Sequence, residues 1–145
     1  MMIRRISYSC DDTFEYGKKL ATKLSKGAIV CLDGELGVGK TVFVQGLAKG
    51  LGIDEYISSP TFTIVNVYGD KLNHFDAYRI GSSDEILDIG FDEYISTDAI
   101  SVIEWAELIK DVIPSDAIWI KINRSNENDD WREICTEVND EHFWD

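Results

Sequence analysis

The sequence of 145 residues has no apolar run long enough to cross a membrane, and its basic beginning, MMIRRISYS, lacks the apolar core of a signal peptide. Cysteine is also scarce. Cys10, Cys31 and Cys135 are odd in number, widely spaced and free of any C-x-x-C pair, which argues against a disulfide framework and against a zinc site. We therefore expect a cytoplasmic protein without a membrane segment, and we expect Cys31 to belong to the core.

Basic residues are few compared with acidic ones, since 14 Lys and Arg stand against 27 Asp and Glu, for a formal net charge of -13. Residues 1–50 hold 8 basic and 5 acidic residues, whereas residues 51–145 hold 6 and 22. An acidic surface of this size repels a nucleic-acid backbone. We expect no strong direct nucleic-acid binding, so that any role at a nucleic acid runs through a partner. A charge that serves only solubility is the alternative.

The length and the 44% hydrophobic content indicate a single domain over residues 1–145 with a substantial core. The acidic tail, about residues 139–145, gives no clear structural signal. A capping box of Asp12 and Glu15 is expected to start the first helix. Strands are expected at 4–9, 28–33, 61–68, 71–78, 99–105, 117–124 and 131–138, and helices at 11–24, 41–51, 82–90 and 106–113.

Residues 34–41 read GELGVGKT, which has the spacing G-x-x-x-x-G-K-[ST] of a phosphate-binding loop. Glycines allow successive backbone N–H groups to turn toward phosphate oxygens. Lys40 would reach the β- and γ-phosphates, and the Thr41 hydroxyl would bind Mg²⁺. The residues expected to bind the nucleotide are Gly34, Glu35, Leu36, Gly37, Val38, Gly39, Lys40, Thr41 and Val42.

The context of this motif decides its meaning, because the pattern arises by accident in on the order of one per cent of chains this long. An apolar run, AIVCLD, precedes it, and a helical pattern follows it up to Gly52. This order of strand, loop and helix aims a helix N-terminus at the phosphates. The sequence therefore predicts an α/β P-loop NTPase domain, in which a mixed sheet adds antiparallel strands to the nucleotide-binding unit.

Two carboxylates follow apolar runs, Asp76 after LNHF and Glu104 after ISVI. A triphosphate site needs such a carboxylate at the end of a core strand to hold Mg²⁺ or its water. We expect Lys40, Asp76 and Glu104 to be catalytic, and Thr41 and Glu104 to hold the metal; solvated strand ends are the alternative. Trp105 packs either on a ligand or, as the default interpretation, on the core edge. His74 is interpreted as a cross-strand residue.

The motifs that identify GTPases are missing, because no Asp is followed by Gly three residues later and N-K-x-D is absent. ATP with Mg²⁺ is therefore the expected cofactor. A small-molecule kinase is the main enzymatic alternative, since Arg79, Arg124 and Arg132 could supply cations to a transition state.

Several segments together resemble the TsaE (YjeE) family: GELGVGKT, SPTFTIVNVY, HFDAYR, the lone Gly90 and IEW occur in the family's order, from about residue 10 to Arg132. The resemblance implies an ATPase that acts with TsaD and TsaB in making threonylcarbamoyladenosine on tRNA. It assigns Lys40 and Thr41 to phosphate and Mg²⁺, Glu104 to the metal site and Asp76 to a Walker-B-like role. It also implies a nucleotide-sensing switch at Ser59 and Thr61, and an arginine near the nucleotide at Arg132.

Three functions are thus in competition. The first is an ATP hydrolase whose turnover drives a TsaD–TsaB complex, with tRNA reached only through that partner. The second is a nucleotide-gated binding module in which hydrolysis is incidental. The third is a small-molecule kinase, for which the sequence offers no obvious acceptor pocket.

Overall fold

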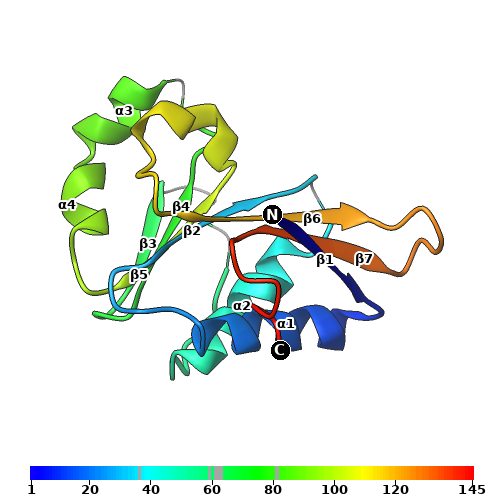
Figure 1. The fold of residues 1–145 in the computed structure, drawn as a ribbon. Helices are drawn as coiled ribbons and strands as arrows, with labels where there is room; N and C mark the ends of the chain where they lie inside the picture. Colours follow the sequence, from blue (N-terminus) through cyan, green and yellow to red (C-terminus); the bar gives the residue numbers. More distant parts are fainter. Residues whose placement is uncertain (36, 59, 61–63, 81) are drawn as a thin grey trace.

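A mixed β-sheet forms the centre of the computed structural model, which describes residues 1–35, 37–58, 60, 64–80 and 82–145 (Figure 1). Seven strands of the described chain join in the order β1-β7-β6-β2-β5-β4-β3. Their bounds are Met2–Ser7 (β1), Ile29–Asp33 (β2), Val65–Tyr68 (β3), Leu72–Asp76 (β4), Ile100–Glu104 (β5), Ile118–Arg124 (β6) and Arg132–Glu137 (β7).

The strand directions confirm the predicted mixed α/β architecture. Strands β6, β2, β5 and β4 run parallel to one another, whereas β7, β1 and β3 pair antiparallel with their neighbours. The parallel strands β2 and β5 are almost continuously buried. Parallel strands are covered on both faces, which is why these segments read as unbroken apolar runs in the sequence.

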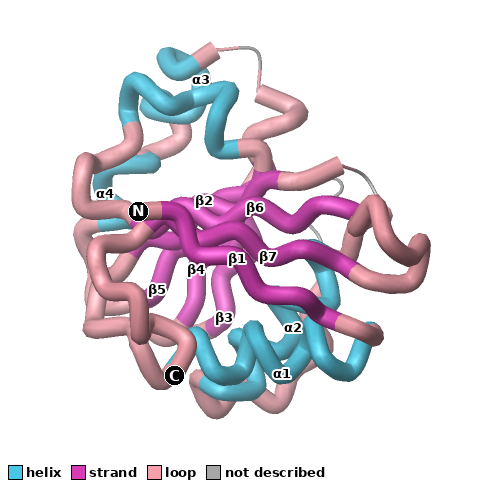
Figure 2. Tube along the Cα trace, turned by 45° about the vertical axis from the view of Figure 1, so that its right-hand side comes forward, coloured by secondary structure: helices cyan, strands magenta, loops and turns pink. Residues whose placement is uncertain are grey.

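Helices cover both faces of the sheet, as Figures 1 and 2 show. Helices α1 (Cys10–Ala21) and α2 (Lys40–Gly50) enclose one core cluster, which includes Leu20, Val30, Phe43 and Leu47. Helices α3 (Ser83–Asp88) and α4 (Phe91–Ile95) and the 3₁₀ segment η1 (Ala106–Val112) enclose a second cluster on the other face. No helix within the described ranges combines the length and the apolarity that a bilayer crossing requires.

Local signals placed most of these elements, but two expectations need correction. The expected capping box of Asp12 and Glu15 is wrong, because Ser9 caps α1: its Oγ accepts from the Asp12 N–H at 3.1 Å, and the Asp12 carboxylate accepts from the Tyr8 N–H at 3.0 Å. Helix α4 was not expected. Gly90 does not simply end a helix, since its backbone at φ 90° starts α4.

The C-terminal tail packs against α1, although its sequence predicts no structure. The Trp144 side chain is 2% exposed and belongs to the core cluster beneath α1 and α2. Its indole N–H donates to Thr136 Oγ1 at 3.1 Å, and its ring meets that of Tyr16 edge to face. One aromatic residue, Trp144, therefore attaches the otherwise acidic tail to the core.

Helices α1 and α2 cross at very short range because each carries a glycine at the contact. A Cβ atom on Gly46 of α2 would lie 1.9 Å from the Phe14 carbonyl oxygen of α1, and a Cβ atom on Gly17 would lie 2.0 Å from that of Phe43. No side chain fits between the two backbones. The N-terminal segment is thereby held rigidly against the helix that follows the 34–41 loop.

Substitution of Gly46 tests this contact. We expect Gly46→Ala to lower the free energy of unfolding by roughly 1–3 kcal/mol, because the added methyl group must push the two helices apart. Urea unfolding followed by circular dichroism measures the loss. Glu15→Ala, on the exposed side of α1, is the matched control and should stay within about 0.5 kcal/mol. Equal stability of the two variants would contradict the close approach.

Candidate functional site

The parallel strands bring three carboxylates to one edge of the sheet. Strands β2, β4 and β5 end at Asp33, Asp76 and Glu104. Because these strands are parallel and in register, their C-terminal ends lie side by side. Asp76 and Glu104 are direct partners across β4 and β5. The 34–41 loop starts at this edge, immediately after β2.

Glycines shape the 34–41 loop where a side chain would not fit. Gly34 has φ 151°, and a Cβ atom there would lie 2.5 Å from the Ile122 carbonyl oxygen. Gly39 has φ 113° and forms the N-cap of α2 without a side-chain hydrogen bond to the helix. The N-terminus of α2 therefore presents its backbone N–H groups toward the loop, an arrangement that favours anions. Leu36, predicted to bind the nucleotide, lies outside the described residues.

Lys40 is the first residue of α2, and the residue as a whole is almost fully buried. The residue is 6% exposed, and Nζ donates to the Gly34 carbonyl oxygen at 2.5 Å. Nζ also lies 4.0 Å from the centroid of the Trp105 ring, within the range of a cation–π contact. Burial lowers the pKa of Lys40, and the nearby charges of Glu104, Asp33 and Asp76 oppose that shift.

Glu104 is a buried carboxylate that meets a buried histidine. The residue is 5% exposed, and its Oε2 lies 2.5 Å from Nε2 of His74, which is fully buried on β4. This contact joins β4 to β5 and agrees with the interpretation of His74 as a cross-strand residue, although that interpretation did not name Glu104 as the partner. Its signal in the sequence is the spacing HFD, because residues 74 and 76 of a strand point to the same face.

Asp76 is a partly buried carboxylate with an altered proton affinity. Burial is the main cause that raises the pKa of Asp76, and the neighbouring Glu104 raises it further. The Tyr78 N–H donates to its Oδ1 at 2.9 Å and favours the ionised form, as does the charge of Arg79.

Trp105 follows β5 in a left-handed backbone conformation, with φ 60° and ψ 34°. This conformation is uncommon for a large side chain and turns the indole toward Lys40. Its ring also contacts that of Tyr78, at 4.9 Å between centroids, and packs on the second core cluster. The default interpretation as a core-edge residue is therefore incomplete, since Trp105 also borders the candidate site.

A cavity of about 440 Å³ unites most of the predicted residues. This volume is within the range of about 300–1,000 Å³ that is typical of small-molecule sites. Its walls are formed by the loop and α2, by the ends of β4 and β5, and by Pro60: Gly37, Gly39, Lys40, Thr41, Val42, Pro60, Asp76, Tyr78, Arg79, Glu104 and Trp105. Sequence reasoning did not place Tyr78 here, and it named Arg79 only as a possible source of a cation for a kinase transition state.

Other predicted residues lie near this cavity or outside the described chain. Arg132 does not line the cavity, and its Nε donates to the Val38 carbonyl oxygen at 2.9 Å, so that it supports the loop from behind. Arg124 also lies beside the loop, since its guanidinium is 3.6 Å from where a Cβ atom on Gly37 would stand. Glu35 is exposed. The predicted switch residues Ser59 and Thr61 are outside the described residues.

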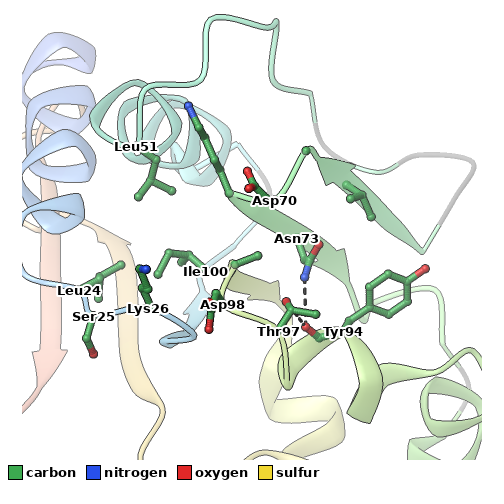
Figure 3. A pocket seen from close by; sticks show the side chains of 14 residues that line it. Leu24, Ser25, Lys26, Leu51, Asp70, Asn73, Tyr94, Thr97, Asp98 and Ile100 are labelled. Carbon is green, nitrogen blue, oxygen red and sulfur yellow. Dashed lines mark hydrogen bonds between the residues drawn. The ribbon is translucent and has the colours of Figure 1, made fainter.

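A larger cavity, of about 730 Å³, lies at the opposite ends of the parallel strands (Figure 3). It is formed by residues 24–26 after α1, by the turn between β3 and β4, and by residues 94–100. Its contacts include a hydrogen bond from Asn73 Nδ2 to the Tyr94 carbonyl oxygen at 3.2 Å. None of the predicted site residues lines it. Chemistry, and not volume, therefore identifies the smaller cavity as the candidate site.

The oxygen ligands that the smaller cavity offers suit a magnesium ion bound together with phosphates. Within the described residues there is no cluster of three or more His, Cys, Asp and Glu that could hold a metal. Mg²⁺ needs no such cluster, because it usually keeps several waters and takes one or two protein ligands besides substrate phosphates. Thr41 and Glu104 line the same cavity and could provide those ligands.

Comparison with known proteins agrees with this geometry. The family model described as "Threonylcarbamoyl adenosine biosynthesis protein TsaE" matches residues 7–134. The chain belongs to the TsaE family. A Treponema pallidum protein named tRNA threonylcarbamoyladenosine biosynthesis protein TsaE is 41% identical over 122 residues, which are 83% of this chain and 90% of that protein. A Bacillus subtilis protein of the same name is 41% identical over 127 residues, 86% of this chain and 78% of its own length.

A solved structure supports the fold of this TsaE family member. The crystal structure of YdiB from Bacillus subtilis superimposes with a TM-score of 0.78 at 32% sequence identity, covering 99% of this chain and 89% of that one. These matches confirm the resemblance seen in the sequence. They connect the chain to a family involved in tRNA threonylcarbamoyladenosine biosynthesis.

The raised pKa of Asp76 predicts that its ionised carboxylate lowers the stability of the protein. The native state holds this proton more tightly than the unfolded state, whose carboxyl has the ordinary pKa of 3.8. The free energy of unfolding therefore falls as the pH rises through the window just above 3.8, and the ionised carboxylate destabilises the protein at pH 7. We expect Asp76→Asn to have a higher Tm than the unmodified protein at pH 7, because the amide oxygen still accepts from the Tyr78 N–H.

The stabilisation should shrink as the pH is lowered toward 3.8, where both states bind the proton. Calorimetry at several pH values measures it. Asp116→Asn, at an exposed carboxyl group, is the control that should not show this dependence. A lower Tm for Asp76→Asn at pH 7 would contradict the electrostatic analysis.

Proposed function

We propose that this member of the TsaE family is a Mg²⁺-dependent ATP hydrolase of the P-loop class, which serves threonylcarbamoyladenosine modification of tRNA together with a TsaD–TsaB complex. The observation that carries the proposal is the buried Lys40 ammonium at the N-terminus of α2, in one cavity with Thr41, Asp76 and Glu104. A cation, a helix N-terminus and two carboxylates are the groups that phosphoryl transfer requires.

The residues of the cavity fit a nucleoside triphosphate and its metal ion. Residues 34–41 would surround the phosphates with backbone N–H groups, and Lys40 would exchange its contact with the Gly34 oxygen for phosphate oxygens. Thr41 and Glu104 would hold Mg²⁺ directly or through water, and Asp76 would orient that shell or the attacking water. When bound, the metal supplies positive charge against the charge that develops on the phosphate oxygens.

The cations around the cavity support slow turnover by the isolated protein. Nε of Arg132 donates to the Val38 carbonyl oxygen, and its Nη1 donates to those of Asp129 and Trp131. These contacts hold the guanidinium beside the loop and outside the cavity lining. Arg79 lines the cavity, but it lies beyond the end of β4 and directly follows Tyr78, whose side chain is exposed to solvent. A cation from a second protein accelerates phosphoryl transfer by roughly 10³ to 10⁵. We therefore assign the acceleration to the partner complex.

The first test separates phosphate binding from metal binding. We expect Lys40→Ala to weaken ATP binding by about 10- to 100-fold, since it removes a charged hydrogen-bond donor worth roughly 1.5–3 kcal/mol. Thr41→Ala should preserve binding in the absence of Mg²⁺ but abolish the gain that Mg²⁺ brings. Fluorescence titration with an ATP analogue, with and without EDTA, measures both.

The control for this test is Lys49→Ala, which removes an exposed lysine from the same helix. Its nucleotide affinity should equal that of the unmodified protein. If Lys40→Ala and Lys49→Ala bind the analogue equally well, the assignment of the loop to phosphate is wrong.

The second test concerns the partner. Residues 51–145 carry a net negative charge and residues 1–50 a small net positive charge, and this asymmetry would orient docking. Contact would run through the segment around Ser58 and Pro60 and through Tyr78 and Arg79 beside the cavity. We expect a TsaD–TsaB complex to raise the rate of phosphate release from ATP. Its association should weaken as salt rises, because screening reduces attraction between charged surfaces.

Phosphate release is measured with and without the complex at concentrations where the proteins demonstrably associate. Arg79→Ala should lower the stimulated rate if this arginine contributes to docking or to the cavity's positive charge, with Lys49→Ala again as the control. Equal rates with and without the complex would favour the nucleotide-gated binding module. Phosphorylated small molecules among the products would favour the kinase.

A further inference from the structure

His74 is a fully buried titratable residue to which the proposed function assigns no role. It lies in the middle of β4, between β3 and β5, and on the same face as Leu72 and Asp76. It is not among the described residues that line the cavity. Its hydrogen-bonded partner is Glu104, which does line the cavity.

The two ring nitrogens of His74 have different surroundings. Nε2 lies 2.5 Å from Glu104 Oε2, whereas the buried Nδ1 has no hydrogen-bond partner among the described residues. A buried carboxylate requires a donor, which places the proton on Nε2. A second N–H at Nδ1 would be a buried donor without an acceptor, so the geometry favours the tautomer with a bare Nδ1.

We infer that His74 is a positioning residue that selects which oxygen of Glu104 serves the cavity. Oε2 is committed to the imidazole, and Oε1 remains as the oxygen available to a metal ion or its water. Glu104 has three rotatable side-chain bonds, and the histidine fixes their setting from a rigid strand. Since His74 also shares a face with Asp76, strand β4 both carries one site carboxylate and orients the other. The inference rests on the proposed function.

The tautomer can be tested without any nucleotide. The chain contains two histidines, His74 and the exposed His142, so ¹⁵N spectra of the imidazoles contain only two sets of signals. We expect the nucleotide-free protein to show one ring with a protonated Nε2 and a bare Nδ1, and Glu104→Gln to shift that ring's signals while those of His142 stay in place. A protonated Nδ1 in His74, or no response to Glu104→Gln, would overturn the inference.

The positioning role is tested by three substitutions that differ in where they place a donor. His74→Gln can offer an amide N–H near the place of Nε2, His74→Asn carries the same group on a shorter side chain that does not reach it, and His74→Leu carries none. Affinity for Mn²⁺ in the presence of ADP, followed by electron paramagnetic resonance, is the main measurement. Binding of the fluorescent ATP analogue in EDTA is measured in parallel.

We expect His74→Leu and His74→Asn to lose Mn²⁺ affinity by about 10- to 100-fold, as is typical when the group that orients a metal ligand is removed. His74→Gln should retain most of it. Binding of the analogue in EDTA should not change in any of the three, which distinguishes positioning from damage to the fold. In hydrolysis, kcat should fall while KM for ATP changes little.

Unchanged Mn²⁺ affinity in a folded His74→Leu would overturn the inference and leave the proposed function intact. If His74→Leu does not fold, the Mn²⁺ affinities of His74→Gln and His74→Asn are compared instead. Equal losses of Mn²⁺ affinity in these two variants would show that the position of the donor does not matter and would also overturn the inference. Absence of Mn²⁺ binding by the unmodified protein with ADP would reject the proposed function, and with it the role of His74 at a metal.

Discussion

The arrangement of the site depends on keeping one ammonium group out of water. Burial of an unpaired charge is costly, and Lys40 is 6% exposed. Its stabilisation comes from separate parts of the chain: the Gly34 carbonyl oxygen, the face of Trp105 and the field of the carboxylates at the ends of β2, β4 and β5. The unusual backbone of Trp105 becomes intelligible in this light, because the left-handed turn after β5 brings an electron-rich ring over the cation.

The carboxylates bring the opposite problem. Asp76 and Glu104 are direct partners on adjacent strands, and their repulsion adds to the cost of burying Asp76. The protein restrains them differently, since Glu104 meets a buried imidazole whereas Asp76 accepts from the backbone of the turn that follows it. Two negative groups held close together beside one lysine leave an excess of negative charge, which a divalent cation would neutralise.

Local patterns in the sequence were sufficient for the strand–loop–helix unit, because β2 reads as a short apolar run directly before the loop. They also placed Asp76 and Glu104, but not Asp33, among the carboxylates at the strand ends. They could not reveal features that depend on strand pairing. The contact of His74 with Glu104 exists only because β4 and β5 pair in register. Likewise, Trp144 stands in an acidic segment, and only its packing on α1 shows that it is a core residue. Helix α4 has five residues, too few for a helical period to be recognised.

The position of β1 in the sheet has a consequence for synthesis on the ribosome. β1 contains residues 2–7, yet its hydrogen-bonded neighbour is β7, residues 132–137. A chain emerges N-terminus first, so β1 waits without a partner until every other described strand has left the ribosome. During that interval β6 also exposes an unpaired edge, since β7 covers it. Open edges of this kind invite pairing with other chains. Nascent chains halted before Arg132 would therefore present two unpaired strands, β1 and the outer edge of β6, to other chains.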